Sequence, residues 1–353
     1  MKNIKILSFL VGLAALFAAC ENNDNEGPVT PEPREQVGRT VLVYIVGDAG
    51  DSNELSDLFK INFSDMKAGM EEVDYSKCNL VVYSEMKNDL PHLISLKQKN
   101  GKVVADTLFT YAEQNPLDKE VMSKVIAQTV DYFPADSYGF VFLSHSSSWV
   151  SASNNANSRS IGYYRKTQMN IPDFREALFS AFPKPLKFIL FDSCNMQSVE
   201  VAYELRDCAE YFIGSPTEIP GPGAPYKAVV PEMFTETNLA MNIAEAYYGY
   251  YEKLYTGVSP ISNENWTGGI ATSVIKSDAL DNLAAATKTI IPKYIQDKRE
   301  VNRSGLLAYD FNDDANYDFD ELIQYLTGGA DNAEYQSWRI AFDNACLLYT
   351  SDA

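Results

Sequence analysis

Short apolar runs alternate with amphipathic segments along most of this 353-residue chain. An unbroken run of four to seven mostly apolar residues is typical of a strand that is buried on both faces, as in a parallel sheet. Buried strands are predicted at 40–46, 79–83, 138–143, 188–191, 211–214 and 269–275, and a hairpin at 93–98 and 103–109 around Asn100-Gly101. Helices are predicted at 54–70, 119–132, 171–182, 198–208, 238–255 and 279–295. Because alternating strands and helices build parallel sheets, we expect an α/β fold with a mainly parallel sheet between two helical layers.

Composition excludes several functions. The net charge is -19 and no basic stripe is present, so we expect no nucleic-acid partner. The five cysteines are irregularly spaced and form neither a disulfide framework nor a CxxC metal site. Cys78 and Cys208 are predicted to be packed thiols without a role.

Cys194 follows the buried strand 188–191 and precedes a helix, which is where open α/β sheets keep catalytic groups. A helix N-terminus would favour its thiolate form. Before the histidines are considered, a cysteine beside such a strand is more often an inert core residue. A nucleophilic thiol needs an imidazole nearby, and the chain has two histidines. His92 is expected on the surface beside the hairpin, whereas His145 ends the strand 138–143, so a Cys194–His145 dyad is the leading hypothesis.

Three segments carry a family resemblance: LSHS at 143–146, DSCNMQSVEVAYEL at 192–205 and SPTEIPG at 215–221. They resemble the clostripain family of cysteine peptidases, and the similarity extends over about residues 40–277. The resemblance implies a caspase-like α/β/α sandwich and an endopeptidase that cleaves after Arg or Lys through a thioester. It also implies that the protein needs no cofactor and takes peptides or proteins as substrates. We expect a monomer.

The resemblance assigns roles residue by residue. Cys194 is the nucleophile, His145 the acid/base, and the backbone N–H groups of Cys194 and Ser146 the oxyanion donors. Asp192 forms the acidic wall of the pocket for the basic side chain, with Glu218 a second candidate. The alternative for Asp192 is a structural carboxylate that caps the strand end. Ser146 replaces the family's glycine, so the alternative for the whole chain is a weak or inactive caspase-fold protein that acts in binding.

The polar segment 146–170 contains Arg159, Arg165 and Lys166. Relatives are often cut in this region into two chains that stay together, so these three residues are candidate processing sites. The alternative is a flexible loop that is not cut.

Six residues near the C-terminus have the spacing of a calcium-binding EF-hand loop, which makes them a candidate calcium site: Asp310, Asn312, Asp314, Asn316, Asp318 and Glu321. Ala315 stands where the motif needs glycine for its sharp turn. The simpler interpretation is a set of acidic residues at the start of a helix at 322–326.

The two ends of the chain have their own signals. Residues 1–19 have the charge and apolar core of a signal peptide, and LFAAC at 16–20 resembles the lipobox of bacterial lipoproteins. We therefore expect an exported protein held in the outer membrane bilayer by a lipidated Cys20, with plain secretion as the alternative. Residues 20–38 are a predicted acidic, disordered tether, whose acidic start resembles surface-export signals of Bacteroidetes lipoproteins. Residues 39–345 form the predicted peptidase domain, and 346–353 resemble translated adapter read-through, so the natural chain is expected to continue.

Overall fold

The computed structural model describes residues 33–50, 54–149, 160–257, 266–295, 301–309 and 316–350. Its strands are β1 (Val37–Val46), β2 (Cys78–Glu85), β3 (His92–Lys99), β4 (Lys102–Thr110), β5 (Ala135–Leu143), β6 (Ser160–Tyr164), β7 (Thr167–Asn170), β8 (Leu186–Asp192), β9 (Ala209–Gly214), β10 (Thr272–Lys276) and β11 (Cys346–Thr350). Its helices are α1 (Glu54–Met70), α2 (Lys119–Tyr132), α3 (Ile171–Ala181), α4 (Val199–Glu204), α5 (Tyr226–Glu232), α6 (Leu239–Glu252), α7 (Leu280–Tyr294), α8 (Phe319–Thr327) and α9 (Ala333–Ala345).

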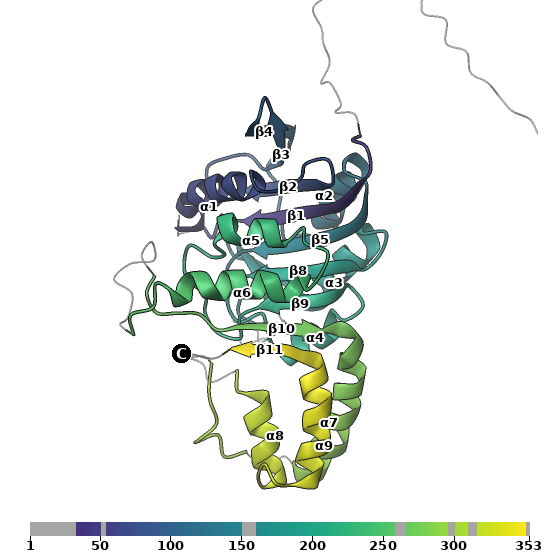
Figure 1. The fold of residues 1–353 in the computed structure, drawn as a ribbon, viewed down its shortest axis with the longest axis vertical. Helices are drawn as coiled ribbons and strands as arrows, with labels where there is room; N and C mark the ends of the chain where they lie inside the picture. The colour runs from purple at the N-terminus through teal and green to yellow at the C-terminus, as the bar shows by residue number, and fades with distance from the viewer. Residues whose placement is uncertain are drawn as a thin grey trace, which may run out of the picture. The chain divides into compact units, whose positions relative to one another are not determined.

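The main sheet has the strand order β11-β10-β9-β8-β5-β1-β2-β3-β4 (Figure 1). Its five central strands, from β9 to β2, run parallel, as the alternating pattern predicts. The outer strands on both sides pair antiparallel. The predicted hairpin is present as β3 and β4, with both residues of its Asn100-Gly101 turn at positive φ, and it extends one edge of this sheet. Antiparallel edges place the parallel strands in the interior, where helices cover both faces.

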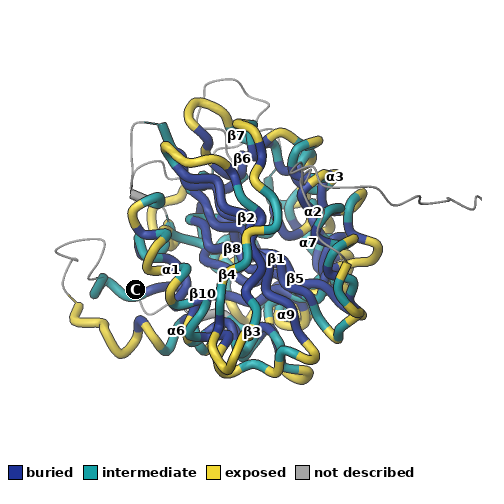
Figure 2. Tube along the Cα trace, turned by 90° about the horizontal axis from the view of Figure 1, so that it is seen from above, coloured by how far each residue is buried: buried dark blue, intermediate teal, exposed yellow. Residues whose placement is uncertain are grey.

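Each face of the sheet carries its own apolar layer. Because side chains alternate along a strand, Leu42, Tyr44 and Val46 of β1 point to one layer and Val41, Val43 and Ile45 to the other. The first layer packs under α2, α3 and α7, and the second under α1, α5 and α6. Figure 2 shows α2, α3 and α7 on one side of the sheet and α1 and α6 on the other. The result is the predicted α/β/α sandwich of caspase-like type.

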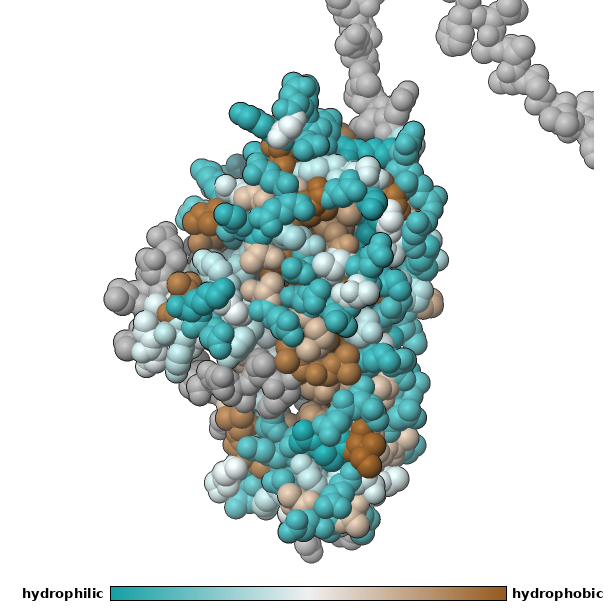
Figure 3. Space-filling model, viewed as in Figure 1, coloured by the Kyte–Doolittle hydropathy of each residue, from teal (hydrophilic) through white to brown (hydrophobic). Residues whose placement is uncertain are grey.

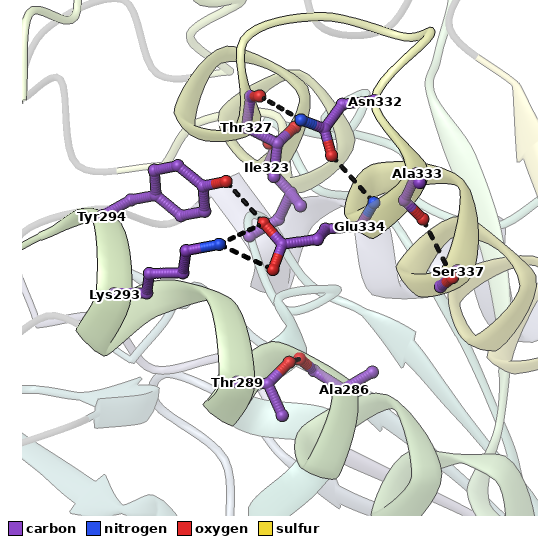
Figure 4. Close-up of polar contacts among 10 residues, drawn as sticks. All are labelled: Ala286, Thr289, Lys293, Tyr294, Ile323, Thr327, Asn332, Ala333, Glu334 and Ser337. Atoms are coloured by element: carbon purple, nitrogen blue, oxygen red, sulfur yellow. Dashed lines mark hydrogen bonds and ion pairs between the residues drawn. The ribbon is translucent and has the colours of Figure 1, made fainter.

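The C-terminal helices are joined by polar contacts at their exposed ends (Figure 4). Glu334 of α9 accepts hydrogen bonds from Lys293 Nζ of α7 at 2.7 and 2.8 Å. Asn332 caps α9 by accepting from Glu334 N at 2.8 Å, and it donates to Thr327 O at the end of α8 at 2.8 Å. The face shown in Figure 3 is largely hydrophilic, in keeping with the acidic composition.

Several predicted boundaries were wrong. The tether predicted over 20–38 ends earlier, because Val37 N donates to Pro134 O at 3.1 Å and Arg34 N to Tyr132 O at 2.9 Å, which ties 34–38 to the domain. The helix predicted over 198–208 has only six residues, and α5, α9 and the β6–β7 hairpin were not predicted. Residues 346–350 form β11, an edge strand paired with β10. Among the residues that the structure describes, none of the helices is long and apolar enough to span a membrane. Residues 1–19 and Cys20 lie outside the described residues.

Candidate active site

Cys194 and His145 leave the sheet at equivalent positions on adjacent strands. β5 and β8 pair in parallel, with Leu143 opposite Asp192, and each candidate residue lies two positions beyond its paired residue. Ser193 joins the two strand ends, since its Oγ donates to Ser144 O at 2.7 Å and accepts from Ser144 N at 3.3 Å. Both candidate side chains are half-buried. The carboxyl edge of the sheet therefore brings a thiol and an imidazole to one rim.

The turn that presents Cys194 is held by the neighbouring loop. Asn195 adopts a left-handed conformation with φ 60°, and its N–H donates to Thr217 O at 3.0 Å. Gln197 is anchored more deeply, because its Nε2 donates to Phe212 O at 3.0 Å and to Ser273 O at 3.2 Å. Ile219 N donates to Cys194 Sγ at 3.5 Å. These contacts hold the turn in place, and the Ile219 N–H contacts the sulfur directly.

The surroundings of Cys194 favour its protonated thiol over the thiolate. Burial raises its pKa to about 11, the charges of Glu218 and Asp192 add to the rise, and the Ile219 N–H opposes it. The expectation that a helix N-terminus would favour the thiolate was wrong, because α4 begins only at Val199, five residues after the cysteine. A thiol in this environment needs a base to accept its proton before it can attack a carbonyl.

Asp192 is buried at the end of β8 and is surrounded by donors of the chain itself. Its Oδ1 accepts from Ala224 N at 2.8 Å and from Tyr247 OH at 3.1 Å, and its Oδ2 accepts from Tyr226 OH at 2.7 Å. Burial raises its pKa to about 6, and these three hydrogen bonds limit the rise. Gly223 packs so closely that a Cβ there would lie 2.6 Å from Oδ2. Glu218, by contrast, is exposed.

Ser146 is accommodated without backbone strain. It is not among the residues with positive φ, so its position does not require glycine. Its Oγ accepts a hydrogen bond from Gly162 N of β6 at 3.2 Å. Serine at this position therefore requires no glycine conformation, although the family has glycine there.

The candidate processing residues differ in their surroundings. Arg165 lies in the β6–β7 turn, where it forms ion pairs with Asp48 at 2.8 Å and Glu113 at 2.6 Å. Lys166 beside it is exposed, and Arg159 lies outside the described residues. The polar segment therefore contains a hairpin, which sequence patterning missed because β6 and β7 are short and interrupted by polar residues.

Of the other candidate residues, Asn316 lies beside the segment that follows His145, where its Oδ1 accepts from Ser148 Oγ at 3.1 Å. His92 begins β3, where its Nδ1 lies 3.0 Å from Thr110 Oγ1. Cys78 and Cys208 are buried free thiols, as predicted. Of the EF-hand set, Asp310, Asn312 and Asp314 lie outside the described residues, whereas Asp318 caps α8 by accepting from Glu321 N at 2.8 Å. Glu321 accepts from Leu307 N at 2.6 Å. Among the described residues, no group of three or more His, Cys, Asp or Glu side chains is placed to hold a metal ion.

A cavity of about 700 Å³ opens beside the Cys194 turn. Gln197 and Pro216 line it on the side of that turn, and side chains of α4, β10, α7, α8 and α9 line much of the rest. Its volume is in the range of pockets that hold small molecules or side chains.

The fold and this rim define a cysteine peptidase of caspase-like architecture. The model of the Clostripain family matches residues 43–340, and the chain belongs to that family. It is similar to a secreted C11 cysteine protease from Bacteroides thetaiotaomicron in complex with an irreversible peptide inhibitor. The two share 42% identity with a TM-score of 0.78, over 89% of this chain and 84% of that chain.

Two further solved structures are similar to it. One is an inactive zymogen C11 protease from Parabacteroides distasonis, with 31% identity and a TM-score of 0.74 over 90% of this chain and 84% of that chain. The other, a second secreted C11 cysteine protease from B. thetaiotaomicron, has 21% identity and a TM-score of 0.74 over 90% and 87%, which shows the fold alone. No curated protein sequence matches this chain.

Proposed function

We propose that this peptidase uses Cys194 as its nucleophile and His145 as its acid/base, and that it cleaves peptide bonds after Arg or Lys. The observation that carries the dyad is the strand register. Leu143 and Asp192 are directly paired, and His145 and Cys194 each lie two positions beyond them at one rim of the sheet. The high pKa of the Cys194 thiol supports a mechanism in which a neighbouring base removes its proton during the reaction.

The proposed steps follow from these groups. His145 takes the thiol proton, and the sulfur attacks the carbonyl carbon of the scissile bond. The backbone N–H groups of Cys194 and Ser146 donate to the resulting oxyanion. The tetrahedral species collapses to a thioester as His145 passes the proton to the leaving amine. Water, deprotonated by His145, then hydrolyses the thioester and restores the thiol.

The preference for basic residues is supported by the charge beside the thiol. Asp192 lies two residues before Cys194, and both Asp192 and Glu218 raise the pKa of the Cys194 thiol, so their charges act at the sulfur. A guanidinium or ammonium group bound next to them would offset that field. The Asp192 carboxylate is occupied by two tyrosine hydroxyls, so the structural role considered for this residue holds beside the proposed one.

We also propose that the protein is exported and anchored through a lipid on Cys20, from the lipobox resemblance. The similar protein from B. thetaiotaomicron is described as secreted, which supports export. Proteolytic processing is proposed at Arg159 or Lys166. Arg165 is the weaker candidate, because its side chain is bound to two carboxylates and a peptide-bond cleft must accept an extended, free segment.

A weak or inactive enzyme is the second candidate, favoured by the Asp192 carboxylate, whose oxygens already accept three hydrogen bonds from the chain itself. The two are separated by kinetics on the purified full chain with an Arg reporter peptide, beside the variants Cys194→Ala and His145→Ala. The proposal predicts loss of cleavage in both variants, and loss of iodoacetamide labelling at low reagent in His145→Ala. Cys208→Ala, at a buried thiol, is the matched control and should keep full activity. Wild-type protein that cleaves nothing would support the inactive alternative.

A further inference from the structure

Both neighbours of His145 are bonded to the β6–β7 hairpin. Ser144 Oγ accepts from Tyr163 N at 3.1 Å, and Ser146 Oγ accepts from Gly162 N at 3.2 Å. One residue further on, Ser147 Oγ lies 2.9 Å from Ser160 Oγ. Hydrogen bonds of Ser144, Ser146 and Ser147 therefore attach the segment that carries His145 to β6.

β6 has little freedom to move on the core below it. Ile161 is fully buried, and Gly162 has φ 75°. A Cβ at Gly162 would lie 2.5 Å from Leu117 Cδ2 and 3.0 Å from Phe142 Cζ. The backbone of β6 thus rests directly on side chains of the apolar layer, and Phe142 belongs to β5, the strand that delivers His145.

The turn of the hairpin is fastened to the carboxyl end of β1. Arg165, at φ 53°, donates from its backbone N to Asp48 O at 2.9 Å and from Nε to Asp48 Oδ2 at 2.8 Å. Its Nη1 contacts Glu113 Oε1 at 2.6 Å. Asp48 is buried, and its other oxygen accepts from Gly50 N at 2.9 Å. One arginine therefore joins the hairpin to β1 and to the segment before α2.

We propose that Arg165 and Asp48 are positioning residues for the reaction, and that they act by holding the β6–β7 hairpin that orients the His145 segment. The inference rests on the proposed role of His145 as acid/base. Displacing a catalytic group by about 1 Å can lower the rate on the order of 100-fold. We therefore expect the loss of the Arg165–Asp48 contact to lower kcat, because it would displace His145. The residues near Asp192 that we propose to bind substrate belong to other elements, so KM should change little.

The test compares Arg165→Gly, Arg165→Lys and Glu113→Gln in the full chain. Glycine tolerates the left-handed backbone, so Arg165→Gly removes the fastening without adding strain. We expect kcat for an Arg reporter peptide to fall about 10- to 100-fold with KM within about threefold. Arg165→Lys should recover part of kcat, since an ammonium reaches one carboxylate but does not bridge two. Glu113→Gln removes only the exposed one of the two ion pairs, so it should lower kcat only a few-fold.

Arg339 provides the matched control. It also pairs with two carboxylates, Asp320 and Asp343, but on the C-terminal helices, so Arg339→Ala should leave kcat unchanged.

A second readout does not depend on activity. The chain has two histidines, so in a His92→Gln background without a histidine tag the imidazole NMR signals report His145 alone. Arg165→Gly should shift and broaden these signals, and Arg339→Ala should not. Unchanged His145 signals together with unchanged kcat in folded Arg165→Gly would overturn the inference. If wild-type protein cleaves no peptide, the proposed function fails, and the NMR comparison still decides whether the hairpin orients His145.

Discussion

Replacing Asp192 with asparagine tests the proposed basic-residue pocket with little damage to the fold. The asparagine side-chain oxygen keeps an acceptor for Ala224 N and Tyr247 OH, and its NH₂ faces the Tyr226 hydroxyl, which can accept. Alanine would instead leave two buried hydroxyls and one N–H without an acceptor, at about 1–3 kcal/mol each. The asparagine variant therefore isolates the charge.

The free energy lost in Asp192→Asn depends on how strongly the carboxylate can still interact with a substrate cation. Pairing of a desolvated carboxylate with a cation is worth roughly 2–5 kcal/mol when one partner is truncated. Three donors already share the Asp192 carboxylate, so we place the effect at the lower end, about 2–3 kcal/mol. At about 1.4 kcal/mol for each factor of ten, kcat/KM for arginine substrates should fall roughly 30- to 150-fold.

The assay compares reporter peptides that have arginine or citrulline before the cleaved bond. Citrulline has nearly the shape of arginine without its charge, so the ratio of the two kcat/KM values cancels the dyad's own titration. Burial raises the pKa of Asp192 to about 6, so the ratio should rise with pH through about 6 as the carboxyl ionises. In Asp192→Asn the ratio should be low and flat with pH.

The control is Glu210→Gln, which removes one exposed acidic charge paired with Lys187 on the neighbouring strand. It should leave the ratio unchanged. Equal losses for arginine and citrulline in Asp192→Asn would refute the pocket, and would leave Asp192 with its structural role alone.

Three further predictions concern the carboxyl end of β2 and the His145 segment. Burial raises the pKa of Glu85 to about 7 from 4.5, so the folded state keeps this proton over a window in which the unfolded state has lost it. Stability should therefore fall by up to about 3 kcal/mol as pH rises from 4.5 to 7, and urea unfolding should show that Glu85→Gln removes this fall. Ser146→Gly removes one hydrogen bond to β6 but keeps those of Ser144 and Ser147, so it should change kcat less than Arg165→Gly does; a large gain in kcat would show that the Ser146 Cβ narrows the site. Gly162→Ala should lower the unfolding free energy by about 1–3 kcal/mol in thermal or urea melts, because it combines positive φ with contact at 2.5 Å; a melt like that of the wild type would contradict the close packing of β6.

Sequence patterning predicted the sheet well where the strands are apolar on both faces. β1, β2, β5, β8 and β9 all coincide with predicted runs, because a strand covered by helices on both sides has no polar positions to interrupt it. The prediction failed for α5, α9 and the β6–β7 hairpin. These elements are short or partly exposed, and contacts with distant segments stabilise them more than their own periodicity does.

Some features of the candidate site could likewise be predicted from the sequence, and others depend on the fold. Sequence alone determined that a cysteine and a histidine follow two buried strands, and a parallel register then brings the two strand ends to one rim. It could not determine the sulfur's proton affinity, which depends on burial and on charges at 192 and 218. Nor could it reveal that Tyr226 and Tyr247 bind Asp192, or that Arg165 is bonded to Asp48. Those contacts join residues 34 to 117 positions apart, and only the folded chain brings such distant groups within hydrogen-bond range.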